Sequence, residues 1–266
     1  MREVLAEKLK LDGVEFDEFV LKDNVKNLLR GRFKALKGQL GYKLPVLLES
    51  RAHTPVMTEE VLFGDDAEAD AFIYSLYADM VSRRVDEETV RAVLRAGEVY
   101  PDDLERAMEL WKSIEPFDPV RRIFINLDRL TPPSHFMRYG PRVVPTFNYF
   151  QAALVLMADG HLTAPQVVRV GIELVQTFGF NLFSLANSMQ DLVRRGIPLG
   201  DVAKSLGEAL QGPAAFVNAV RPVPDIIAAF GSKLSALGAP PRAPASVTID
   251  YLALIDDARP RTRQKS

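Results

Sequence analysis

The stretch TPPSHFMRYGPRVVP, residues 131–145, contains four prolines and one glycine. Proline has no backbone N–H and breaks an α-helix, so this stretch cannot be helical throughout. Sequence patterns typical of α-helices lie on both sides of it. It therefore predicts a proline-rich hinge that joins an N-terminal helical lobe, residues 1–130, to a C-terminal helical lobe, residues 146–238.

Helical patterns fill the predicted N-terminal lobe. Apolar residues recur at a spacing of three or four between residues 25 and 40, before Gly41. A carboxylate precedes each further apolar stretch, as expected of residues that cap a helix. We therefore expect helices to begin after Asp65 or Asp66, after Asp86, and after Asp102 or Asp103.

The predicted C-terminal lobe shows similar helix signals. Thr163, Pro165 and Gln166 form a capping-box pattern that predicts a helix up to Gly179, and Asn181 is expected to cap the next helix. Further helices are expected at residues 199–210, 214–220 and 224–237.

Strand-type alternation of apolar and polar residues is scarce. Residues 121–127 and 247–252 are the two candidates. Because helical patterns dominate everywhere else, the sequence predicts an all-α protein of about ten helices, arranged as two helical lobes with a C-terminal arm.

The C-terminal arm follows a short linker. Residues 239–246, APPRAPAS, are typical of a semi-extended linker and would span roughly 25 Å in a polyproline-like conformation. Residues 247–255 are mostly apolar, and a basic tail completes the segment 239–266. The apolar part must be buried, either on its own body or on a neighbouring copy as a swapped arm.

Composition excludes several classes of protein and site. The chain of 266 residues has 47% hydrophobic and 26% charged residues, as soluble globular proteins do. It has no cysteine, which excludes disulfides, thiolate zinc sites and cysteine nucleophiles. The longest apolar run, residues 152–158, is too short to cross a membrane, and no signal-peptide core is visible. We therefore expect a cytoplasmic protein with no membrane span.

The net charge of -2 conceals a strong asymmetry along the chain. Residues 1–57 carry a net charge of +3, residues 58–118 carry -11, residues 119–144 carry +4, and residues 145–266 carry +2. Such segregation either presents one positive surface to a polyanion or brings acidic and basic parts together inside one fold.

One run of cations lies in the N-terminal lobe. Its members recur at helical spacing, and no acidic residue occurs between positions 24 and 42. This pattern indicates a helix that lies along a phosphate backbone or an anionic membrane surface. The alternative is a solvated face that the acidic segment neutralises. The candidate residues are Lys22, Lys26, Arg30, Arg32, Lys34, Lys37 and Lys43.

A second candidate surface surrounds the hinge, where arginines and aromatic residues alternate. Arginine pairs with phosphates and an aromatic ring stacks on an unpaired base, as in proteins that hold single strands. Phe147 and Phe150 are assigned instead to the core of the following helix. The candidate RNA contacts here are Arg121, Arg122, Arg129, Phe136, Arg138, Tyr139 and Arg142.

No pattern in the sequence indicates catalysis. Four pairs of adjacent carboxylates lie at predicted helix starts, where capping explains them. The three histidines are isolated, and no phosphate-binding loop or nucleophile elbow is present. We therefore expect a protein that is not an enzyme and needs no metal and no cofactor.

Three of these features together resemble a known group of proteins. A two-lobed helical body, a basic stripe with a basic–aromatic hinge, and a terminal arm behind a proline linker resemble the RNA-coating nucleoproteins of bunyavirus-like segmented RNA viruses. In that family two lobes clamp single-stranded RNA and an arm links neighbouring subunits. Residues 238–246, GAPPRAPAS, also resemble the proline-alanine-serine-rich proteins that coat polymycovirus genomes.

The sequence thus favours a non-enzymatic, largely sequence-independent RNA-binding protein that coats single-stranded RNA and self-associates. The alternative is a helical scaffold or adaptor with segregated acidic and basic surfaces. A third hypothesis is a hydrolase whose carboxylates come together in space.

Overall fold

The computed structural model describes residues 2–20, 32–210 and 247–258. The predicted helices at 214–220 and 224–237, the linker at 239–246 and the basic tail lie outside the described residues. In chain order the elements are α1 (Arg2–Leu11), α2 (Arg32–His53), β1 (Glu60–Asp65), α3 (Asp70–Val81), α4 (Glu87–Ala96), α5 (Pro101–Ser113), β2 (Val120–Asn126), the 3-10 helix η1 (Pro133–Tyr139), β3 (Val143–Thr146), α6 (Tyr149–Ala158), α7 (Ala164–Phe178), α8 (Leu182–Arg194), α9 (Val202–Leu210) and α11 (Tyr251–Ala258).

The predicted all-α fold class is wrong, because the helices surround a parallel sheet of three strands in the order β1-β2-β3. Only β2 matches a predicted strand, at residues 121–127. The other predicted strand, 247–252, pairs with no strand of the described residues, and from Tyr251 onward it is the helix α11. The strands β1 and β3 are short and lack a clear alternation, which is how a strand covered on both faces looks in sequence.

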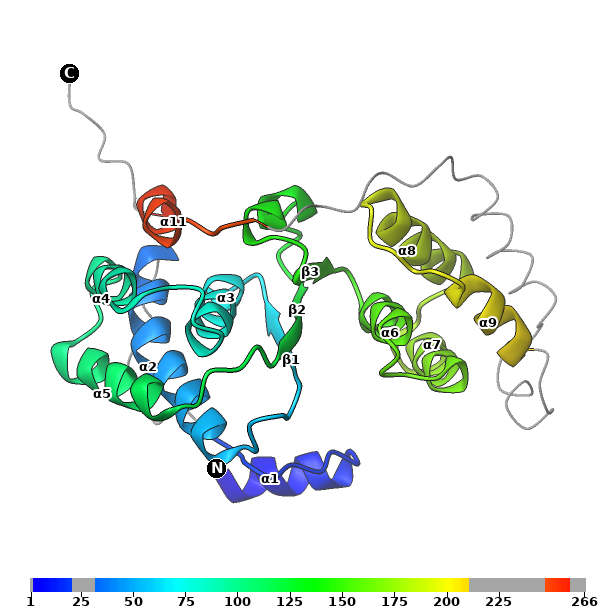
Figure 1. Ribbon diagram of the computed structural model, residues 1–266. Helices are drawn as coiled ribbons and strands as arrows, with labels where there is room; N and C mark the ends of the chain where they lie inside the picture. Colours follow the sequence, from blue (N-terminus) through cyan, green and yellow to red (C-terminus); the bar gives the residue numbers. More distant parts are fainter. Residues whose placement is uncertain (1, 21–31, 211–246, 259–266) are drawn as a thin grey trace.

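The sheet is the middle layer of the molecule (Figure 1). Neighbouring residues of β2 point to opposite faces, as in any strand. Ile123 and Ile125 enter a first core with α2, α3, α4 and α5, whereas Phe124 enters a second core with α6, α7, α8 and α9. A single strand therefore supplies side chains to both cores.

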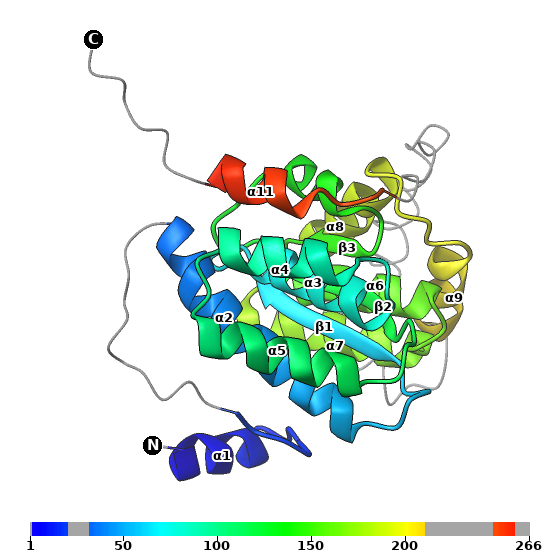
Figure 2. The same cartoon turned by 60° about the vertical axis from the view of Figure 1, so that its left-hand side comes forward.

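The first core is built on α2, whose Leu40, Leu44 and Leu48 are fully buried. Their spacing of four places them on one stripe of the helix, against α3 and α5. Figure 2 shows β1 between α3 and α5, with α11 lying across α4. Among the described helices, α1 buries no side chain, and none is long and apolar enough to cross a membrane.

The C-terminal arm docks on its own body. Tyr251 and Ile255 of α11 are buried in the first core, although the helices that precede α11 in the sequence, α6 to α9, belong to the second core. The Tyr251 ring packs edge-on against Phe72 at 5.5 Å, and its hydroxyl donates a hydrogen bond to Asp79 at 2.6 Å. The arm thus fastens a late part of the chain to an early one.

Several predicted helix starts are confirmed. Asp86 and Asn181 accept hydrogen bonds from the backbone N–H groups of Thr89 and Ser184, and Thr163 opens α7 with a capping box. The capping role predicted for Asp65 or Asp66 is wrong, because Ala69 precedes α3.

The predicted cap of α5 is also misplaced. Tyr100 precedes that helix, and Pro101 is its first residue. The adjacent carboxylates Asp102 and Asp103 lie in the first helical turn, where their negative charges interact favourably with the positive end of the helix dipole.

Candidate functional site

Four of the five candidate hinge arginines are ion-paired with carboxylates. Arg121 bonds Glu59 at 2.6 Å, and Arg122 holds both oxygens of Asp159 at 2.6 and 2.7 Å. These arginines neighbour each other on β2, so their side chains leave opposite faces of the sheet. On each face, a carboxylate forms an ion pair with the arginine, Glu59 with Arg121 and Asp159 with Arg122.

The remaining hinge arginines differ among themselves. Arg142 bonds Asp118 at 3.1 Å, and Arg138 bonds Asp257 of α11 at 2.9 Å. Arg129 is exposed and uses its backbone N–H, which donates to Asp66 at 2.8 Å. The acidic segment 58–118 thus supplies partners to Arg121 and Arg142, and charges that are segregated along the chain meet within one fold.

The hinge itself is a folded part of the body. Residues 133–139 form η1, and residues 143–146 form the edge strand β3. Phe136 is only 5% exposed and belongs to the first core, so its ring has no open face for a base. Tyr139 packs against the same core, and burial raises the pKa of its hydroxyl to about 12.

The basic run of the N-terminal lobe is divided by the limits of the described residues. Lys22, Lys26 and Arg30 lie outside them. Arg32, Lys34 and Lys37 lie in the first turns of α2, and their side chains are not among those described. Lys43, further along α2, bonds Glu68 at 2.6 Å and Asp70 at 2.5 Å, so it acts within the fold.

The Lys43–Asp70 pair lies beside the carboxyl end of β1. Burial lowers the pKa of Lys43, but hydrogen bonds to Asp70 and Glu68 outweigh it and raise that pKa overall. Burial also raises the pKa of Asp70, against the opposing effect of Lys43. Gly64 makes this arrangement possible, because a Cβ at that position would lie 2.5 Å from the Asp70 side chain.

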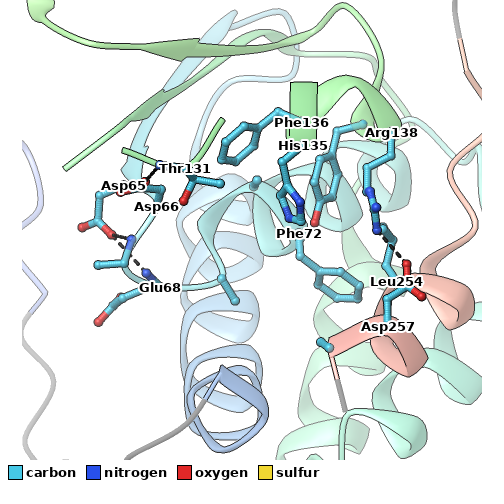
Figure 3. Close-up of a pocket in the computed structure, with 15 residues that line it drawn as sticks. Asp65, Asp66, Glu68, Phe72, Thr131, His135, Phe136, Arg138, Leu254 and Asp257 are labelled. Carbon is cyan, nitrogen blue, oxygen red and sulfur yellow. Dashed lines mark hydrogen bonds and ion pairs between the residues drawn. The ribbon is translucent and has the colours of Figure 1, made fainter. Parts of the chain in front are cut away.

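A crevice of about 200 Å³ opens near this pair, between the loop after β1, η1 and α11. In parallel α/β sheets, ligands often bind beyond the carboxyl ends of the strands. Figure 3 shows Phe136, His135 and Arg138 on one side of the crevice, facing Phe72 and α11. The candidate residues Phe136, Arg138 and Tyr139 therefore come together here.

The charge of this crevice is predominantly negative. Asp65, Asp66, Glu68 and Asp257 line it, together with one arginine. Burial raises the pKa of Asp66, but hydrogen bonds from the backbone N–H groups of Arg129 and Thr131 outweigh it, and the pKa is lowered. A crevice with this excess of carboxylates repels phosphate, so it does not suit the RNA contact predicted for the hinge.

A second cavity, of about 590 Å³, lies under the residues that lead into α11. Arg84 and Arg142 line it on one side, and residues 247–249 on the other. Both arginines bond Asp118, and Asp79 lies 3.8 and 3.9 Å from them. The two positive charges at this cavity are therefore balanced by two carboxylates.

A third depression lies between the start of α6 and the outer face of α7. Tyr149, Arg169, Val170 and Phe178 line this groove of about 440 Å³. The sequence analysis assigned Phe147 and Phe150 to the core. Phe150 is indeed buried, but Phe147 is 43% exposed.

Tyr149 belongs to the stretch of alternating arginines and aromatic residues, but only Phe136 and Tyr139 were kept there as candidate contacts; Arg169 and Phe178 were not singled out. Tyr149 directly precedes the core residue Phe150, so its outward position follows once the helical phase is known. Arg169 and Phe178 lie far from it in sequence, and no local pattern joins them.

Comparisons with protein-family models, curated proteins and solved structures gave no match. Within the described ranges, no group of three or more histidine, aspartate or glutamate side chains is placed to hold a metal ion.

Proposed function

We propose that the protein binds single-stranded RNA largely without sequence preference, self-associates on it in the cytoplasm, and acts without catalysis. The observation that carries this proposal is the stretch 24–42, which holds five lysines and arginines and no acidic residue. A dense run of cations without carboxylates is suited to the phosphates of a nucleic acid.

Ion pairing of the hinge arginines reduces the number of residues that we expect to contact phosphates. An arginine already bonded to a carboxylate must release that partner before it binds a phosphate, which offsets much of the gain. Arg121, Arg122, Arg138 and Arg142 are all in this position. We therefore place the main phosphate contacts on Lys26, Arg30, Arg32, Lys34 and Lys37, and not on the hinge.

A pair of matched triple variants tests this assignment. Lys26, Arg30 and Lys34, all changed to Glu, should abolish binding of a labelled single-stranded RNA 12-mer in fluorescence anisotropy. The control reverses Arg106, Lys112 and Arg121, which have the same total charge but are exposed and ion-paired. The control should retain most of the affinity, because its cations are already neutralised.

Salt dependence gives the second measurement. For a single strand, the slope of log affinity against log salt is about 0.7 per phosphate contacted. The first triple variant should lose roughly three such contacts, with circular dichroism verifying that it is still folded. Equal loss in both triple variants would mean that only net charge matters, and unchanged binding in the first would refute the assignment.

Self-association is the second part of the proposal. The seat of α11 on the first core can accept the same helix from a second copy, because the linker sequence allows an extended path. Deletion of residues 239–266 should then convert an oligomer into a soluble monomer with weaker RNA binding. Light scattering that finds a monomeric full chain, with and without RNA, would contradict this part.

A scaffold or adaptor role remains the alternative. Absorbance at 260 nm of the purified protein separates the two, because a coating protein copurifies with nucleic acid and an adaptor does not.

A further inference from the structure

The groove between α6 and α7 exposes two aromatic rings that lie far apart in sequence. Tyr149, at the start of α6, is 58% exposed, and Phe178, the last residue of α7, is 66% exposed. Both line the same groove of about 440 Å³, and the two helices run side by side in Figure 1. Exposed rings on one groove present faces on which a planar group can stack.

A cation without a carboxylate partner lies on the same groove. Arg169 is exposed, and within the described part of the chain no ion pair or hydrogen bond involves its side chain. Glu173, which also lines the groove, lies one turn further along α7, where an ion pair would be expected. Its carboxylate instead accepts a hydrogen bond from the Thr177 hydroxyl at 2.6 Å. Arg169 thus contrasts with the paired arginines of the hinge.

We infer that this groove binds one nucleotide of single-stranded RNA, with the base stacked against both Tyr149 and Phe178 and the phosphate held by Arg169. The inference rests on the proposed function, because it assigns a base-binding position to the same RNA. Stacking on aromatic faces is tolerant of base identity, which agrees with binding that reads no sequence. Among the described residues, this groove has one carboxylate beside an arginine without a carboxylate partner, whereas the crevice beside η1 has four carboxylates and an arginine bonded to Asp257.

Alanine variants measure the contribution of each ring. Tyr149→Ala and Phe178→Ala should each weaken binding of a single-stranded oligouridine 12-mer by about five- to 150-fold, while leaving the salt slope unchanged. Tyr149→Phe keeps the ring and should retain the affinity. Tyr100→Ala removes an exposed tyrosine beside α5 and should have no effect. Loss in Tyr149→Phe equal to that in Tyr149→Ala would refute stacking at this position.

Arg169 has a different expected signature. Arg169→Ala should reduce the slope of log affinity against log salt by about 0.7, the value for one phosphate contact on a single strand. Arg169→Lys keeps the charge and should keep the slope. An unchanged slope in Arg169→Ala would show that Arg169 contacts no phosphate in this groove.

A fluorescent reporter separates failure of this inference from failure of the proposed function. The only tryptophan, Trp111, is buried in the first core, so Phe178→Trp places a second tryptophan directly on the groove. Added oligouridine should quench its emission, with Trp111 in the unmodified chain as the control.

Two negative results have different meanings. If the unmodified chain binds RNA while the new tryptophan is not quenched and the alanine variants bind normally, the groove is not the base-binding position and the proposed function stands. If the unmodified chain binds no RNA even at low salt, both proposals fail.

Discussion

The two sides of the central sheet differ at the surfaces that carry candidate RNA contacts. On the side of α2 to α5, basic side chains such as Lys43 and Arg142 are bonded to carboxylates, and the rings of Phe72 and Tyr251 are buried. On the side of α6 to α9, polar side chains are buried, while the rings of Tyr149 and Phe178 are exposed.

Three buried polar residues of the second side, Asn148, Gln151 and Ser188, form one network. Gln151 is fully buried and donates to Asp191 at 2.9 Å and to the Ser188 carbonyl at 2.8 Å. Asn148 caps α6 and donates to the Ser188 hydroxyl. Because buried hydrogen bonds between helices fix their relative packing, Asn148 and Gln151 hold α6 against α8 on this side.

The largest expected contrast between the two sides comes from the same substitution made on each. Gly64→Ala should lower the free energy of unfolding by about 3–5 kcal/mol, because the new Cβ displaces Asp70 from Lys43 and leaves a buried charge unpaired. Gly207→Ala in α9, where a Cβ meets no atom of the described residues within 4 Å, should raise it by about 0.5–1 kcal/mol.

Urea denaturation of the two glycine variants measures both effects. Wild-type stability in Gly64→Ala would show that Asp70 is not held beside β1 as described. Destabilisation by Gly207→Ala would show instead that a neighbour covers that face of α9.

A second contrast concerns the docked arm. Tyr251→Ala should lower the free energy of unfolding by about 3 kcal/mol, because a buried ring against Phe72 is lost and Asp79 loses its hydrogen bond. Leu252→Ala, one residue later and 40% exposed, should change it by less than about 0.5 kcal/mol. Thermal unfolding with limited proteolysis of the arm compares them, and equal effects would mean that α11 is not seated through Tyr251.

The smallest contrast compares a paired arginine with an unpaired one. Arg122→Ala should cost about 1 kcal/mol, because Arg122 links β2 to Asp159 after α6 through a bidentate contact. Arg169→Ala should stay within about 0.5 kcal/mol of wild type. High salt should shrink the first effect. A stability loss in Arg169→Ala as large as that in Arg122→Ala would assign Arg169 a structural role.

Local signals in the sequence were sufficient for many helices. Asp86, Thr163 and Asn181 cap the helices predicted for them, because a capping side chain bonds its own neighbours and needs no distant partner. The sheet could not be predicted in the same way. Pro145 indicated a hinge, but it lies in β3, an edge strand, where a missing N–H is tolerated.

The candidate site depends even more on distant contacts. No carboxylate lies near Arg142 in the sequence, yet the fold brings Asp118 and Asp79 close to its guanidinium group. Composition alone gives the net charge of each segment, but it does not show which side chains form ion pairs with one another. For the same reason, Tyr149 and Phe178 could be recognised as neighbours only once α6 and α7 were packed.

The seat of α11 has a consequence for how the protein is made. Tyr251 reaches Asp79 across 172 residues of chain. At about 5–20 residues per second, a ribosome needs on the order of 10–30 s to synthesise that interval. Throughout it, the nascent first core has an uncovered apolar notch beside Phe72. The chain therefore completes this core only when α11 emerges from the ribosome.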